Sequence, residues 1–169
     1  MQTKEAILTR RSIRQYTSEP IAKELLEELV KSAMSAPSAR NLQPWHFVII
    51  QDKKMLSEIA RLHAHGAMAA KANAAILICA DSKKEETEGF WVQNCAAAMQ
   101  NLLLAAHDQN IGAVWVGLYP RSERMATFQK LFNLPKEIMP FSLAVLGHPN
   151  ESKAKEERFK KECLHYEQW

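Results

Sequence analysis

Glycine is scarce in this chain. Five of the 169 residues are glycine, and the sequence contains neither a GxGxxG motif nor a Walker loop. Loops that bind phosphate through backbone N–H groups use glycine where the chain must approach the ligand closely. A phosphate bound by this chain would therefore have to be held by side chains.

The motifs of hydrolases and metalloenzymes are also missing. There is no GxSxG motif, and no histidine is spaced to pair with a serine or cysteine nucleophile. His63 and His65 are two positions apart, so they would point in different directions on a helix, and no HExxH motif accompanies them. We therefore expect neither a hydrolase site nor a metal site.

Cysteines are few, and long hydrophobic runs are absent. Cys79, Cys95 and Cys163 lie far apart without a CxxC pair, which is typical of a reducing compartment. The longest apolar run, 74–80, is far shorter than the ~20 residues of a membrane span, and the polar residues 1–14 do not resemble a signal peptide. We expect a cytoplasmic protein that does not enter the membrane.

The length and the 47% hydrophobic content predict a single domain over residues 1–169. The net charge of +3 is too balanced to indicate a nucleic-acid partner. Beyond Pro149 the sequence is almost all charge as far as Lys161. We therefore predict that 150–169 is a tail that wraps something else, since it has few apolar groups for a core of its own.

Hydrophobic periodicity predicts the secondary structure. Ser18 is expected to cap a helix that has Pro20 in its first turn and ends near Ser35. The helix over 90–108 is apolar nearly all round, which is typical of the centre of a core or of a subunit interface. Trp45 and Trp115 are interpreted as core residues. The other predicted helices cover 2–9, 53–64 and 122–132, the strands cover 46–50, 75–80, 113–117 and 141–147, and a charged linker covers 83–88.

Two stretches could build a binding site together. Arg10, Arg11 and Arg14 surround Ser12, and arginine forks match the oxygens of a phosphate two at a time. By itself this stretch is most simply interpreted as a solvated basic face or a nucleic-acid patch. The loop 36–45, rich in small and amide-bearing residues, favours a phosphate-bearing cofactor instead. Arg158 would be a further donor if the tail folds back.

These stretches resemble the FMN-dependent nitroreductase family. The resemblance is carried, in order, by Arg10-Arg11-Ser12-x-Arg14-x-Tyr16, Pro37-Ser38-x-x-Asn41-x-Gln43-Pro44-Trp45-x-Phe47, Ala97-x-x-x-Asn101-Leu102-Leu103-Leu104-Ala105-Ala106, Gly112-x-x-Trp115-x-Gly117 and Gly147-His148-Pro149.

The resemblance implies an α+β fold, a three-layer sandwich with a central, mostly antiparallel sheet flanked by helices. It also implies a homodimer with two FMN sites at the subunit interface. The long apolar helix would then pack against its twin, and the tail 150–169 would wrap the partner subunit.

The resemblance assigns residues to the cofactor site by position. Arg10, Arg11, Ser12 and Arg158 would hold the FMN phosphate and ribityl chain. Arg14 would lie near the N1/C2=O edge, where a cation favours the reduced flavin.

Other residues would surround the flavin ring. The backbone N–H near Val116 and Gly117 would donate to flavin N5. The ring would also be lined by residues of the other subunit, namely Pro37, Ser38, Ala39 and Asn41. Ala39 stands where a second serine is common, and any role of Lys71, His63 or His65 is left open.

The activity implied is an oxidoreductase. NADH or NADPH would give hydride to flavin N5 and leave, and a nitroaromatic, a quinone or a similar acceptor would then take its place in a ping-pong mechanism. The cofactor carries the chemistry, so no protein acid or base is required. The alternative is an FMN-binding carrier or sensor without significant NAD(P)H turnover. The short segment between Cys79 and the long helix predicts an open pocket.

Overall fold

A four-stranded antiparallel sheet forms the middle of the molecule. The computed structural model describes residues 1–84 and 89–169. The strand order is β1-β2-β4-β3, and each neighbouring pair is antiparallel. The two central strands are buried on both faces, which explains why their sequences are continuous apolar runs. The strands are β1 (Trp45–Ile50), β2 (Ala74–Asp81), β3 (Gly112–Gly117) and β4 (Ile138–Gly147).

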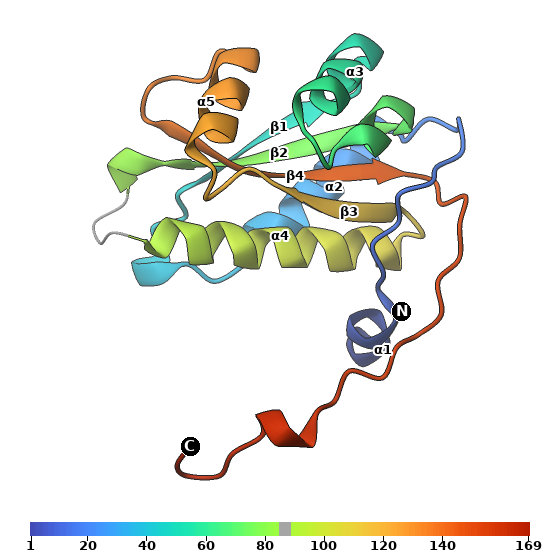
Figure 1. Ribbon diagram of the computed structural model, residues 1–169, viewed down its shortest axis with the longest axis vertical. Coiled ribbons are helices and arrows are strands. Elements are labelled where there is room, and N and C mark those ends of the chain that lie inside the picture. Colours follow the sequence, from blue (N-terminus) through green and yellow to red (C-terminus); the bar gives the residue numbers. More distant parts are fainter. Residues whose placement is uncertain (85–88) are drawn as a thin grey trace.

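Helices cover both faces of this sheet (Figure 1). On one face α2 (Lys23–Met34) and α4 (Phe90–Asp108) pack together over a first hydrophobic cluster. On the other face α3 (Lys53–Leu62) and α5 (Ser122–Leu131) cover a second cluster. The predicted three-layer α+β sandwich is confirmed. The short helix α1 (Thr3–Thr9) lies outside these layers, near the C-terminal end of α4.

The start of α2 differs from the prediction. Ser18 does not cap a helix, because α2 begins at Lys23 with Ala22 as its N-cap residue. Ile21 is 2% exposed and packs into the first cluster, and its carbonyl accepts a hydrogen bond from Gln51 Nε2 at 2.8 Å. The segment before α2 is therefore held in an extended form by tertiary contacts that local sequence preference cannot reveal.

The two tryptophans differ in burial. Trp45 is buried, as predicted, but the interpretation of Trp115 as a core residue is wrong, since its side chain is 37% exposed. Trp115 lies on β3, an edge strand, and its ring meets Phe141 edge-on with centroids 5.7 Å apart. An edge strand leaves room beside it, and the large ring borders that space.

Helix α4 and the tail leave apolar surface exposed. One face of α4 is buried, while Ala97 and Leu104 on another face stay half-exposed. The tail runs away from the layers in extended form, with a short 3-10 turn at Lys161–Cys163 (Figure 1). Its Phe159 and Trp169 are 69% and 102% exposed.

The predicted charged linker is described in part. Lys83 and Lys84 end the 3-10 turn Ser82–Lys84, and 85–88 lie outside the described residues. Two further 3-10 turns, Ala39–Asn41 and Ala67–Lys71, belong to segments near the candidate site. Within residues 1–84 and 89–169, no helix has the length and apolar character needed to span a bilayer.

Candidate functional site

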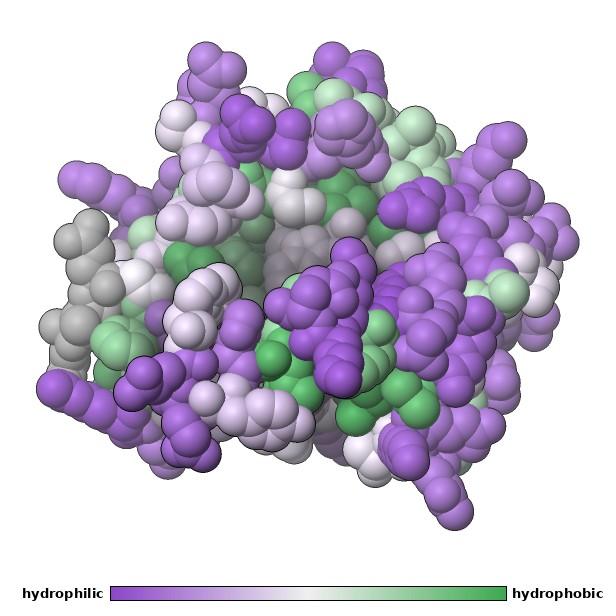
Figure 2. Space-filling model, turned by 60° about the horizontal axis from the view of Figure 1, so that its bottom comes forward, coloured by the Kyte–Doolittle hydropathy of each residue, from purple (hydrophilic) through white to green (hydrophobic). Residues whose placement is uncertain are grey.

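A cavity of about 580 Å³ lies along the edge of β3, between the α3–η2 segment and the start of α5, where η2 is the turn Ala67–Lys71. Figure 2 shows a hollow near the middle of this face, bordered by both hydrophilic and hydrophobic side chains. Among the described residues that line the cavity, none is a carboxylate. An anionic or electron-rich ligand suits such a space. The lining residues that can carry positive charge are Arg14, His63, His65, Arg121 and Arg124.

The backbone of β3 presents hydrogen-bonding groups to this edge. The carbonyl of Ala113 accepts a hydrogen bond from the N–H of Ile13 at 3.0 Å, so Ala113 faces away from β4. In an antiparallel strand the N–H and C=O of one residue point to the same side, and the side alternates along the chain. The N–H groups of Trp115 and Gly117 therefore also point to the open edge.

Two side chains donate to the carbonyl of Gly117. His63 Nε2 lies 2.9 Å from this oxygen and Arg124 Nη1 lies 3.1 Å from it. The other ring nitrogen of His63 accepts from the backbone N–H of His65 at 3.1 Å. His63 is therefore neutral, with its proton on Nε2. Burial is the main cause that lowers the pKa of His63, which agrees with this neutral form.

A second cavity, of about 210 Å³, lies beside the N-terminal arginines. Arg10 is half-buried there, and its pKa is lowered by burial first and then by the nearby charges of Arg158 and Arg11. None of the ion pairs within the described part of the chain involves Arg10. Cations held together in this way favour an anion between them.

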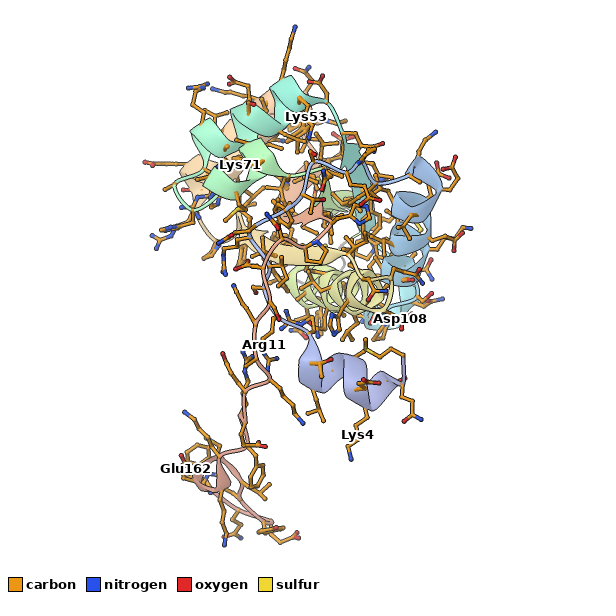
Figure 3. The ribbon with its side chains drawn as sticks, turned by 90° about the vertical axis from the view of Figure 1, so that its right-hand side faces the viewer. Lys4, Arg11, Lys53, Lys71, Asp108 and Glu162 are labelled. Atoms are coloured by element: carbon orange, nitrogen blue, oxygen red, sulfur yellow. The ribbon has the colours of Figure 1, made fainter. Side chains whose placement is uncertain are left out.

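Arg11 is mostly engaged with backbone carbonyls. Its Nε donates to the carbonyl of Ala154 at 2.9 Å, and its Nη1 donates to the carbonyls of Leu8 and Arg10. Its Nη2 is buried, with no hydrogen-bond partner among the described residues. Figure 3 shows Arg11 where the C-terminal segment passes α1. Arg11 therefore anchors the tail, and the two N–H bonds of its Nη2 have no partner among the described residues.

The loop before β1 lines a third cavity, of about 330 Å³, at the N-terminal half of α4. The N–H of Ala39 donates to Asn94 Oδ1 at 3.0 Å, and Ser38 Oγ accepts from the N–H of Gln43 at 3.0 Å. His107, near the other end of α4, lines the second cavity. At 1.5 Å per residue, Asn94 and His107 are ~20 Å apart along the helix.

The family of this chain follows from comparison with known proteins. The family model described as the nitroreductase family matches residues 7–148. The chain belongs to the nitroreductase family. A protein of Methanothermobacter thermautotrophicus, provisionally named NADH dehydrogenase/NAD(P)H nitroreductase, is 43% identical over 169 residues, which are all of this chain and 88% of that protein.

Solved structures of other nitroreductases share the fold. A crystal structure from Desulfovibrio desulfuricans, provisionally named a nitroreductase and in complex with FMN, has a TM-score of 0.85 and 30% identity, with 98% of this chain and 96% of that chain covered. The NADPH:FMN oxidoreductase of Vibrio harveyi, complexed with NAD⁺, has a TM-score of 0.86 and 26% identity, with 99% and 77% covered.

Within the single chain, the predicted site residues fall into separate groups. Arg14, Val116 and Gly117 line the large cavity, and Arg10 and Arg11 line the second. The third cavity contains the predicted residues Pro37, Ser38 and Ala39. The lining of these three cavities does not include Ser12, Asn41 or Arg158.

Sequence reasoning missed the contact of Arg124 with Gly117 and left the region 63–71 open. In the structure of this chain, four residues of that region line the large cavity, namely His63, His65, Ala67 and Met68. The glycine-containing turn after α3 was a signal for His63, because it brings the histidine back towards the sheet. Nothing in the local sequence distinguishes Arg124 from an ordinary surface arginine.

Proposed function

We propose that this protein is an FMN-dependent oxidoreductase that transfers hydride from NADH or NADPH to a small electron acceptor such as a nitroaromatic or a quinone. The observation that carries the proposal is the edge of β3, where the N–H of Gly117 points into a cavity lined by cations and free of described carboxylates. Membership of the nitroreductase family, and the FMN and NAD⁺ bound in the two solved relatives, support it.

The residues present fit FMN. Bound FMN would supply hydride transfer through its N5 atom. The buried Nη2 of Arg11, without a described partner, suits a phosphate oxygen. Arg10, Ser12 and Arg158 would complete the grip on the phosphate and ribityl chain, since the charges of Arg158 and Arg11 already act on Arg10.

The ring end of the site also fits. Arg14 lines the large cavity and would lie at the pyrimidine edge, while Val116 and Gly117 would border N5. Apart from the two neighbouring residues, a Cβ atom built on Gly117 would meet no atom of the described residues closer than 3.8 Å. The protein itself therefore has room for a side chain there, which is consistent with a glycine kept for the approach of a ligand.

We further propose a homodimer, because one subunit does not bring all the predicted residues together. A two-fold axis across α4 would place the N-terminal half of one helix beside the C-terminal half of the other. The loop with Pro37, Ser38, Ala39 and Asn41 of one subunit would then face the arginines of the second. Residues 1–169 would form a single domain, with 150–169 as a tail that wraps the other subunit and covers its exposed apolar side chains.

The protein's part in the reaction is binding and orientation. The large cavity is open to solvent, so the nicotinamide nucleotide and the acceptor can occupy the same face of the flavin in turn. We propose ping-pong kinetics on this basis. No side chain is required to move a proton at N5. The cytoplasmic location expected from the three free cysteines stays a prediction.

The test is the visible absorption spectrum of the purified protein before and after anaerobic addition of NADPH or NADH. A flavin band that bleaches, and returns when a nitroaromatic or a quinone is added, supports both halves of the proposal. A flavin band that no nicotinamide nucleotide bleaches would point to an FMN carrier. Absence of a flavin band after incubation with FMN would refute the site.

A further inference from the structure

Gly117 stands at the end of an edge strand, where its N–H and carbonyl groups face no neighbouring strand. Glycine has more conformational freedom than any other residue, and beyond it the chain leaves β3, with the N–H groups of Leu118 and Tyr119 both donating to the carbonyl of Phe141 at 3.0 Å. A donor N–H on such a residue can hold a ligand in one position only if its own orientation is fixed.

The side chain of His63 holds Gly117 in its orientation from one side. The turn after α3 is closed by a hydrogen bond from the N–H of Gly66 to the carbonyl of His63 at 2.8 Å. A Cβ atom at Gly66 would lie 2.9 Å from that of His63, so the turn can pack this tightly only with glycine. Phe128 meets the imidazole edge-on, and the side chain is 2% exposed. The ring therefore has one orientation, with Nε2–H towards Gly117.

Arg124 reaches the same oxygen from the first turn of α5. Its guanidinium adds a charge-assisted hydrogen bond, which is about twice as strong as a neutral one. Helices α3 and α5 are otherwise separate elements on one face of the sheet (Figure 1). The carbonyl of Gly117 is thus the point at which both helices hold the end of β3.

We infer that His63 and Arg124 form a clamp of positioning residues that fixes the N–H of Gly117 towards the cavity. The inference rests on the proposed function, because the N–H would be the donor to flavin N5. The N–H and the carbonyl of Gly117 belong to successive peptide units, and two donors on the carbonyl restrain the torsion angles of Gly117 that connect these units. The hydride-accepting atom would then be presented to the nicotinamide in one geometry. Misplacement of reacting groups by 1 Å can cost ~100-fold in rate.

The first test distinguishes the effect of the His63 hydrogen-bond donor from the effect of its side-chain volume. His63→Phe keeps a buried ring but cannot donate, and His63→Gln keeps a donor near the position of Nε2. We expect His63→Phe to slow flavin reduction at saturating NADPH about tenfold or more and to change the shape of the flavin band. We expect His63→Gln to restore most of the rate. His46→Phe, at an exposed histidine of β1, is the control and should leave the rate unchanged.

The second test separates the hydrogen bond of Arg124 from its charge. Arg124→Gln keeps a donor without charge, Arg124→Lys keeps the charge on a different geometry, and Arg124→Leu keeps neither. A clamp predicts that reduction slows most in Arg124→Leu and least in the variant that best retains the donor to Gly117. Arg61→Leu, which removes a surface arginine paired with Glu58, is the matched control.

Rates are measured by stopped flow with FMN in excess, and FMN affinity and thermal unfolding are measured separately. A purely structural role would lower thermal stability and leave the reduction rate of the remaining folded, FMN-bound protein unchanged, and that result would overturn the clamp. If His63→Phe does not fold, the Arg124 series decides the question. If the unchanged protein binds no FMN, the proposed function fails, whereas normal reduction in both donor-free variants refutes only the clamp.

Discussion

Arg10 and Arg11 are neighbours in the chain, yet the structure gives them different surroundings. Arg11 holds three backbone carbonyls, while Arg10 stays among like charges. We expect Arg11→Ala to lower the free energy of unfolding by about 1–3 kcal/mol, because three partly buried hydrogen bonds from a charged donor are lost. Arg10→Ala should leave that free energy nearly unchanged.

The second part of this prediction concerns FMN affinity, which is measured by titration. Loss of a charge-assisted contact to the phosphate in Arg10→Ala should weaken FMN binding about 10- to 100-fold. Urea unfolding and the change in flavin fluorescence measure the two effects separately. Retention of full FMN affinity in Arg10→Ala would show that the phosphate is bound elsewhere.

A methyl group on Gly117 tests the close approach of the ligand. Since the chain leaves room for a Cβ atom at this position, Gly117→Ala should fold normally but bind FMN about tenfold more weakly, because the methyl group crowds the ring. In the control Gly112→Ala, the new Cβ atom would lie 2.7 Å from Ile13 Cγ2, and we expect a lower thermal midpoint. Equal FMN affinity for Gly117→Ala and the unchanged protein would argue against N5 at this edge.

Two histidines, His63 buried and His107 half-buried, make the free energy of unfolding depend on pH. Burial lowers the pKa of His63 and of His107 below the ordinary value of 6.5. The unfolded chain therefore binds protons at a higher pH than the folded one, and the free energy of unfolding should fall as the pH is lowered from 7.5 through 6.5 towards 5. Urea unfolding across this range measures the slope. In His63→Gln the slope should be smaller, and an unchanged slope would assign the effect to other groups.

At the scale of elements, the tail is held at its start and free at its end. Lys153 Nζ donates to the carbonyl of Ser12, and Ala154 is bound by Arg11. Phe159, Tyr166 and Trp169 are largely exposed. The tail is therefore attached to the rest of its own chain near its start, and its apolar groups further along are exposed.

Removal of 156–169 tests this division. We expect the shortened chain to keep its thermal midpoint within a few degrees and to dissociate as a dimer at least about tenfold more readily, since apolar area is lost from the interface. Sedimentation velocity over a range of concentrations measures the change. Arg158→Ala in the full chain should weaken FMN binding without changing the dimer. An unaltered dimer in the shortened chain would show that the tail does not wrap the second subunit.

At the scale of the whole molecule, the proposed dimer depends on the exposed face of α4. Ala97 is half-exposed there and lines the same cavity as Ser38. Ala97→Glu would bury a charge in the interface, so we expect a monomer that has lost FMN, because each site needs both subunits. Size-exclusion chromatography with detection at 450 nm reads both properties. Ala126→Glu, on the exposed side of α5, should stay dimeric and yellow. A monomer that retains FMN would refute a shared site.

Most elements could be predicted from the sequence because their signals are local. The apolar run of β2 and the amphipathic pattern of α2 depend on neighbours in the chain. The arginines around Ser12 could likewise be found as a binding stretch, since their side-chain chemistry needs no structure to be read.

Other features were decided by tertiary contacts. Ile21 is extended because Gln51 holds its carbonyl, and Trp115 is exposed because β3 lies at an edge. His63 and Arg124 both contact the carbonyl of Gly117, and His63 is more than fifty residues away from it in the sequence. Both contacts depend on the packing of α3 and α5 over one face of the sheet. Periodicity specifies which residues are buried, but it does not specify which strand becomes the edge or which side chains converge on it.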